Sequence, residues 1–148
     1  MKKFPLAKIV LAIVLFTLSQ STFSQCKKVG KKCLPSLSPY IYTGQLNSTT
    51  LNEGETAELQ ITLYSGQSYR ILVCSPEFLG KVVFNVFDSK KKLLYASKDH
   101  SNAANWDFRV NSTDDYTIQV TVPHSKNIKV ADIAMSGCIA VLVGFKNE

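Results

Sequence analysis

The chain has 148 residues, with 17 Lys or Arg against 11 Asp or Glu, and its formal charge at pH 7 is +6. Three of the basic residues lie in an N-terminal leader, so 14 basic and 11 acidic residues, or +3, remain after it. An excess this small does not indicate a nucleic-acid partner, and the length suits one domain with a real hydrophobic core.

The N-terminus reads as a secretory leader. Lysines precede the apolar run 9–18, and small polar residues follow up to Ser24. A basic start, an apolar centre of this length and small residues at a cleavage point are typical of a signal peptide, and the run is too short to span a bilayer comfortably. We predict a cleaved signal peptide over residues 1–24. The mature protein is then expected in the periplasm or outside the cell, without a transmembrane anchor.

Residues 25–43 read as an extended lead-in, because Pro35 and Pro39 disfavour regular structure. Four lysines in it are expected to form a solvated loop, with contact to an anionic envelope surface or polysaccharide as the alternative. These are Lys27, Lys28, Lys31 and Lys32. Tyr40 and Tyr42 lie beside the prolines and outside the strand pattern, so they are the candidates for ligand-facing aromatics. Packing against the edge of the domain is the ordinary explanation for them.

Residues 44–148 are predicted to form a single all-β domain, because apolar and polar residues alternate with period two. In chain order, strands are expected at residues 58–63, 69–74, 82–87, 93–97, 106–111, 116–122 and 138–145. Trp106 shares its strand face with Phe108 and Val110, which favours a place in the core over a surface for sugar rings. The last strand is apolar on both faces, which is typical of a central strand.

Turn residues such as Ser65-Gly66 separate these strands, and no helical periodicity stands between them. Short strands with turns at this spacing indicate an antiparallel two-layer β-sandwich of jelly-roll or Greek-key type. The longest connection, residues 124–137, is expected to cross between the two sheets, with a functional loop as the alternative.

All four cysteines follow the leader, and an even number in an exported chain indicates disulfides. Cys26 and Cys33 flank a short polar segment that closes easily into a loop. Cys74 ends one predicted strand and Cys138 opens another, and antiparallel neighbours bring such positions together. We therefore predict Cys74–Cys138 and Cys26–Cys33. Lipidation of Cys26 is disfavoured because Gln25 takes the place of the small residue that a lipobox needs, and the absence of C-x-x-C disfavours zinc or redox sites.

The order of motifs resembles the bacterial pre-peptidase C-terminal domain over residues 44–145. The turn Ser65-Gly66-Gln67-Ser68 precedes Tyr69-Arg70-Ile71-Leu72-Val73, and Tyr116-Thr117-Ile118-Gln119-Val120 follows later. The resemblance implies a β-sandwich that accompanies secreted enzymes as an accessory or binding module. Some relatives bind calcium near the N-terminal edge, where this chain has Glu53, Glu55 and Glu58. We favour a solvated strand edge over a calcium site for these glutamates, and we predict no metal.

Catalytic motifs are missing from the sequence. His100 and His124 are the histidines that could act as a base, both in polar connections, and there is no G-x-S-x-G, H-E-x-x-H or Walker loop. Asp114 and Asp115 are expected to cap a turn. We predict a non-catalytic exported protein without a cofactor, which binds a glycan or protein partner in the envelope or has a structural role. A small secreted hydrolase and an envelope-assembly partner acting through a sheet edge are the alternatives.

Overall fold

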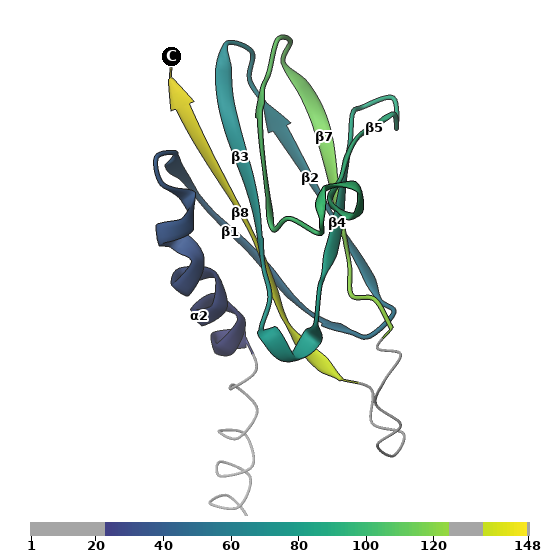
Figure 1. The fold of residues 1–148 in the computed structure, drawn as a ribbon. Helices are drawn as coiled ribbons and strands as arrows, with labels where there is room; N and C mark the ends of the chain where they lie inside the picture. The colour runs from purple at the N-terminus through teal and green to yellow at the C-terminus, as the bar shows by residue number, and fades with distance from the viewer. Residues whose placement is uncertain (1–22, 125–134, 148) are drawn as a thin grey trace, which may run out of the picture.

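The computed structural model describes residues 23–124 and 135–147 (Figure 1). Within them the helical elements are α2 (Phe23–Cys33) and the 3-10 turns η1 (Leu34–Leu37), η2 (Glu77–Leu79) and η3 (Ser97–His100). The strands are β1 (Ile41–Asn52), β2 (Thr56–Leu63), β3 (Gln67–Cys74), β4 (Val83–Phe87), β5 (Leu93–Ala96), β6 (Asn105–Arg109), β7 (Asp114–Thr121) and β8 (Ser136–Asn147). None of the helices in the described part of the chain has the length and apolar character needed to cross a membrane.

The strands form two four-stranded antiparallel sheets. Sheet 1 has the order β1-β8-β3-β6 and sheet 2 has the order β2-β7-β4-β5. Eight strands in this order make a jelly roll, which confirms the predicted all-β sandwich. β8 lies between β1 and β3, so the prediction of a central last strand is also confirmed. The predicted crossover falls mostly on residues 125–134, outside the described residues, although β7 and β8 on either side of it lie in different sheets.

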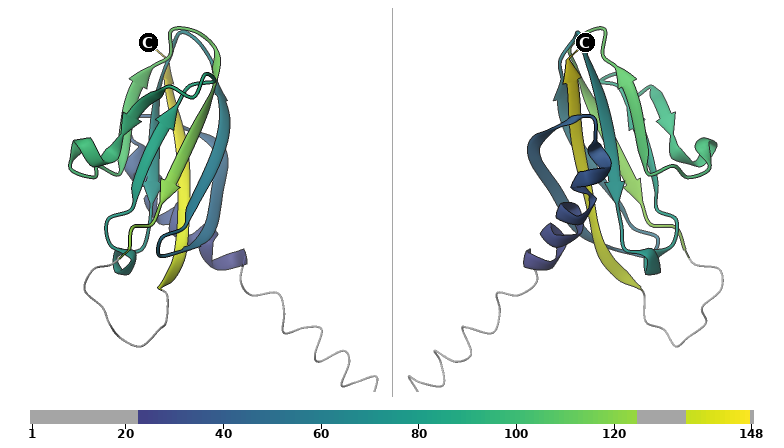
Figure 2. Two further views of the ribbon diagram at one scale, coloured as in Figure 1. Left: turned by 90° about the vertical axis from the view of Figure 1, so that its right-hand side faces the viewer. Right: turned by 60° about the vertical axis from the view of Figure 1, so that its left-hand side comes forward.

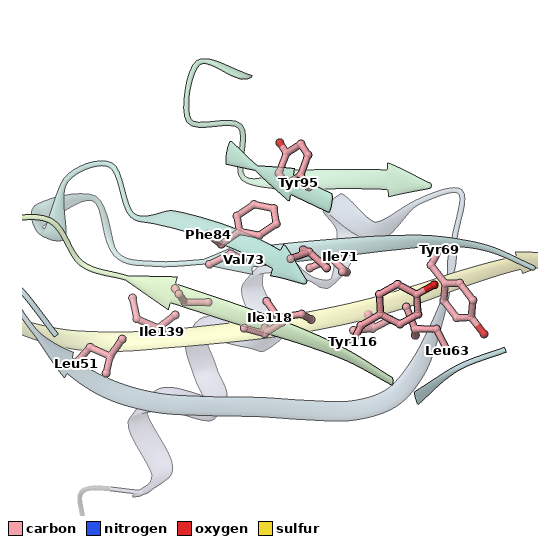
Figure 3. Close-up of a cluster of buried hydrophobic side chains, with 14 of the residues drawn as sticks. Leu51, Leu63, Tyr69, Ile71, Val73, Phe84, Tyr95, Tyr116, Ile118 and Ile139 are labelled. Atoms are coloured by element: carbon pink, nitrogen blue, oxygen red, sulfur yellow. The ribbon is translucent and has the colours of Figure 1, made fainter. Parts of the chain in front are cut away.

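The main core lies between the sheets, where alternate side chains of both layers meet (Figure 3). β7 shows the pattern clearly, since Tyr116, Ile118 and Val120 are buried while the residues between them are partly exposed. Sheet 1 contributes Ile71 from β3, and sheet 2 contributes Phe84 from β4. The period-two alternation read from the sequence is therefore the alternation between core and surface.

The predicted extended lead-in is wrong, because residues 25–43 contain α2, η1 and the start of β1. One face of α2 is buried or partly buried, and its residues have helical spacing: Cys26, Val29, Gly30 and Cys33. The opposite face carries four exposed lysines, Lys27, Lys28, Lys31 and Lys32. α2 is therefore an amphipathic helix, and its lysines face solvent as expected.

α2 lies on the outer face of sheet 1 beside β8 (Figure 2). Leu37, Leu72, Ala140 and Leu142 are buried there and form a second, smaller core. The helix comes so close to β1 that a Cβ atom on Gly30 would overlap the Leu46 side chain, which explains a glycine in the middle of a helix. The sandwich thus has a third layer on one side.

The disulfides correct the predicted pairing, since they join Cys26 to Cys138 and Cys33 to Cys74. β3 and β8 are antiparallel neighbours as expected, but their register places Cys74 opposite Ala140. Cys26 and Cys33 are two turns apart on α2, or about 10 Å along its axis. A disulfide needs Cα atoms within about 7 Å. Each helix cysteine instead bonds to a strand cysteine, with Cα–Cα distances of 4.9 and 6.4 Å, and the sulfur of Cys26 is not available for lipidation.

Candidate functional site

Tyr40, a candidate ligand-facing aromatic, lies under the guanidinium of Arg70, whose central carbon is 4.7 Å from the ring centroid. Arg70 Nε and Nη2 each donate to the Asp107 carboxylate at 2.6 Å. Arg70 Nη1 donates to the backbone oxygens of Ser36 and Ser38 at 3.2 and 2.8 Å. The hydrogen bonds between the two side chains lower the pKa of Asp107 and raise the pKa of Arg70. This cluster fastens the N-terminal segment to sheet 1.

Tyr42 also lies against the sandwich, because it packs on the second core and burial raises the pKa of its hydroxyl. Trp106 packs against the main core as predicted, with its ring stacked on Phe108 at a centroid distance of 4.0 Å. A ligand-facing role for Tyr40 and Tyr42 stays a prediction. Two aromatic rings of the described residues are largely exposed, Tyr64 at 61% and Phe78 at 58%, and they lie in different turns.

Tyr64 stands in the β2–β3 turn, at the end of the sandwich where β2 and β6 finish (Figure 1). The hydroxyl of the buried Tyr69 accepts a hydrogen bond from the Tyr64 backbone N–H at 3.1 Å and donates to Gln67 Oε1 at 2.8 Å. The next residue, Ser65, donates its backbone N–H to Thr113 Oγ1 in the β6–β7 turn at 3.0 Å. These bonds hold the backbone that carries Tyr64.

Asp114 and Asp115 form hydrogen bonds at the same end of the sandwich, where the β4–β5 and β6–β7 turns also lie. Asp114 accepts hydrogen bonds from the Ser89 hydroxyl and from the backbone N–H of Asp115, both at 2.9 Å. Asp115 accepts from the Thr62 hydroxyl at 2.6 Å. The bond from Ser89 lowers the pKa of Asp114. The Asp114 carboxylate therefore connects the β4–β5 and β6–β7 turns, whereas the Asp115 carboxylate joins β7 to β2. We call the three turns at this end, residues 64–67, 88–92 and 110–115, the loop end.

Sequence reasoning located the turns of the loop end but not the side chains that connect them. The turn at Ser65-Gly66 was readable because Gly66 supplies the positive φ of +80° that it requires, although β2 and β3 belong to different sheets and do not form a hairpin. The acceptor Thr113 and the donor Ser89 are ordinary turn residues, and their contacts depend on how three turns from distant parts of the chain come together. Alternation after the buried Leu63 directs the Tyr64 side chain outward, but nothing local distinguishes it from other outward residues.

The histidines lie in separate connections. The His100 ring stacks on Tyr95 with centroids 4.9 Å apart at the end of η3, whereas His124 lies beside Gly54 at the β1–β2 turn. Glu55 accepts the backbone N–H of Asn52 at 2.8 Å, and this hydrogen bond lowers its pKa. In residues 23–124 and 135–147, no three His, Cys, Asp or Glu side chains are grouped closely enough to hold a metal ion.

No protein-family model and no curated protein matches the chain. Among solved structures, it is similar to Aeromonas hydrophila PliG, described as a periplasmic lysozyme inhibitor of g-type lysozyme, with 12% identity and a TM-score of 0.50 over 73% of this chain and 89% of that one. The PliG of Salmonella Typhimurium has 16% identity and a TM-score of 0.42 over 69% and 90% of the two chains. A PliG mutant from Escherichia coli has 12% identity and a TM-score of 0.43 over 74% and 91%. The likeness to the Aeromonas protein is one of fold.

Proposed function

We propose that this protein is an exported, non-catalytic binding protein whose loop end engages a protein partner, and that the partner is a g-type lysozyme. The observation that carries the proposal is an exposed tyrosine on a backbone that is already hydrogen-bonded in place. Tyrosine is enriched among the residues that contribute most to protein–protein binding. A loop held in its binding conformation loses little conformational entropy when the partner arrives.

Ile41 supports a protein partner, because it is 59% exposed and the register of β1, β8 and β3 places it in line with Phe145 and Tyr69, toward the loop end. Two large apolar side chains in reach of solvent give a partner something to bury, while the polar turn residues can form the rim of an interface. The inhibitors with a similar fold support the choice of a lysozyme as the first partner to test.

Export is supported by the disulfides. Both bonds join segments far apart in the chain, and no described cysteine is free. Stable disulfides of this kind belong to oxidising compartments such as the periplasm. The leader predicted at residues 1–24 gives the same location, and most of it lies outside the described residues.

The test uses the purified disulfide-bonded protein in a cell-wall lysis assay with a g-type lysozyme, together with direct binding by surface plasmon resonance. We expect inhibition that depends on the concentration of the protein. Tyr64→Ala is expected to weaken binding by roughly thirtyfold, the effect of losing a typical hot-spot residue.

Phe78→Ala is the matched control, because Phe78 is 58% exposed but lies on η2 at the opposite end of the sandwich. It is expected to bind the lysozyme like the unaltered protein. An unaltered protein that neither binds nor inhibits the enzyme would refute the proposal. Equal losses from the two substitutions would show that the loop end is not the binding surface.

A further inference from the structure

β1 and β2 leave a common turn and diverge, because they belong to different sheets (Figure 1). β1 is hydrogen-bonded to β8, and β2 is hydrogen-bonded to β7. In the described part of the chain, β1 and β2 are therefore each an edge strand of their sheet. The sandwich is therefore open along the line between these two strands. We call this opening the seam.

The seam contains two cavities of about 500 and 510 Å³, both within the range of roughly 300–1,000 Å³ typical of ligand sites. The cavity of about 500 Å³ is lined by Ile118 and Ile139, among others, and we call it the lower cavity. The cavity of about 510 Å³ lies nearer the loop end, is lined by Val143 and Phe145, among others, and is the upper cavity. Along β2 they extend from Ala57 to Tyr64, which is about 23 Å at the usual rise per residue of a strand. An elongated ligand would fit the seam better than a compact one.

The β1 wall of the seam is polar at positions where a sandwich strand normally contributes apolar side chains. Leu51 belongs to the main core, so Thr49 and Asn47, two and four residues before it, lie on the same inner face. Thr43 and Gln45 continue the wall beside the upper cavity. None of these four polar side chains has a hydrogen-bond partner among the described residues.

The two walls differ in chemistry, and charged side chains line the lower cavity but not the upper one. The β2 wall presents the partly buried Leu59 and Ile61, which pack against the main core. No ionisable Lys, Arg, Asp, Glu or His side chain lines the upper cavity, and the lower one has Lys27 and Glu58. Amides and hydroxyls both donate and accept hydrogen bonds. The seam therefore suits an uncharged ligand with hydroxyl groups along one side and C–H groups along the other.

We propose that the seam binds an uncharged oligosaccharide, with its hydroxyl groups on Gln45 and Asn47 and a sugar face near Tyr64, which lines the upper cavity. An extended peptide pairing with the β1 edge fits less well, because β1 changes register with β8 between Tyr42 and Leu46. An irregularity of this kind interrupts the row of backbone groups that strand addition needs.

The test is a titration of the ¹⁵N-labelled protein with chitotetraose and maltotetraose, followed by NMR, with tetragalacturonate as a charged comparison. At least one neutral sugar is expected to shift the side-chain amide signals of Gln45 and Asn47 at concentrations up to about 10 mM, which covers weak binding. The double variant Gln45→Leu with Asn47→Leu should weaken this binding by at least about tenfold. Asn105→Leu, an exposed position on the opposite edge of sheet 1, should leave it unchanged.

Thermal unfolding of each variant shows whether the fold is kept. No shift with either neutral sugar, shifts confined to other surfaces, or equally strong binding of the charged sugar would overturn the proposal. Binding of extended peptides at the seam in place of sugars would overturn it as well. Asn47→Leu alone should retain lysozyme inhibition, because Asn47 is not part of the loop end. The two proposals can therefore fail independently.

Discussion

The disulfides that hold α2 on sheet 1 lead to a quantitative prediction. The bonds close separations of 112 and 41 residues. In the chain-entropy model such loops stabilise the folded state by about 5 and about 4 kcal/mol, respectively. Single domains are stable by about 5–15 kcal/mol in total. Replacing Cys33 and Cys74 together by Ala should therefore lower the free energy of unfolding by about 4 kcal/mol, and the same change at Cys26 and Cys138 should cost slightly more.

α2 should respond more strongly than the sheets. An isolated helix of 11 residues is marginal in water, and α2 also has Gly30 at its centre and like-charged lysines four residues apart. Hydrogen exchange of the Cys33→Ala, Cys74→Ala variant should show faster exchange in the second half of α2, while β8 stays protected. Urea unfolding provides the change in stability.

The pairing itself can be read from a tryptic digest under non-reducing conditions. Cleavage after the lysines and arginines places each cysteine on a different peptide. The structure predicts that peptide 33–70 is linked to 71–81, and that the peptide containing Cys26 is linked to 130–146. A link between 71–81 and 130–146 would refute the reasoning from register and helix geometry. So would a double cysteine variant with unchanged stability and unchanged exchange in α2.

Other positions give further expectations. Leu142→Ala should lower the free energy of unfolding by about 3 kcal/mol in urea denaturation, because it removes a fully buried side chain from the second core. Gly54→Ala should cost about 1–2 kcal/mol by the same assay, since Gly54 has φ of +81° and a Cβ would meet the His124 ring. The folded-state pKa of Asp107 is lowered, so its stabilisation is present above its unfolded pKa, about 3.9, and is lost as the pH falls through the folded value. Asp107→Asn should therefore flatten the acid limb of a stability–pH curve measured by thermal unfolding, and an unchanged acid limb would contradict the role assigned to Arg70.

The strands of the main core were predictable because burial imposes a period of two on the sequence. β7 is the clearest case, with Tyr116, Ile118 and Val120 all turned inward. The placement of β8 was also readable, because a strand covered on both faces has no polar alternation. The resemblance to pre-peptidase C-terminal domains stays a prediction, since the likeness of fold concerns other proteins.

β1 and α2 were missed for different reasons. β1 does not alternate, because its inner face is polar at Asn47 and Thr49, beside an open seam. α2 has helical spacing in Cys26, Val29 and Cys33, but it has few apolar residues, and its four lysines and Gly30 are also typical of a polar loop. The disulfide pairing depends on the register of β3 with β8 and on the position of α2 above them. These are relations between distant segments, and local patterns do not contain them.

The connectivity of the cysteines also bears on how the chain matures. In a polypeptide that is translocated from its N-terminus, Cys26 and Cys33 emerge first, and Cys138 follows 112 residues after Cys26. An oxidase acting in order of emergence would join the first two sulfurs, which is the wrong bond for this fold. Correct maturation then requires thiol–disulfide exchange after translocation is complete. The yield of native protein should accordingly depend on the disulfide isomerase available in the host.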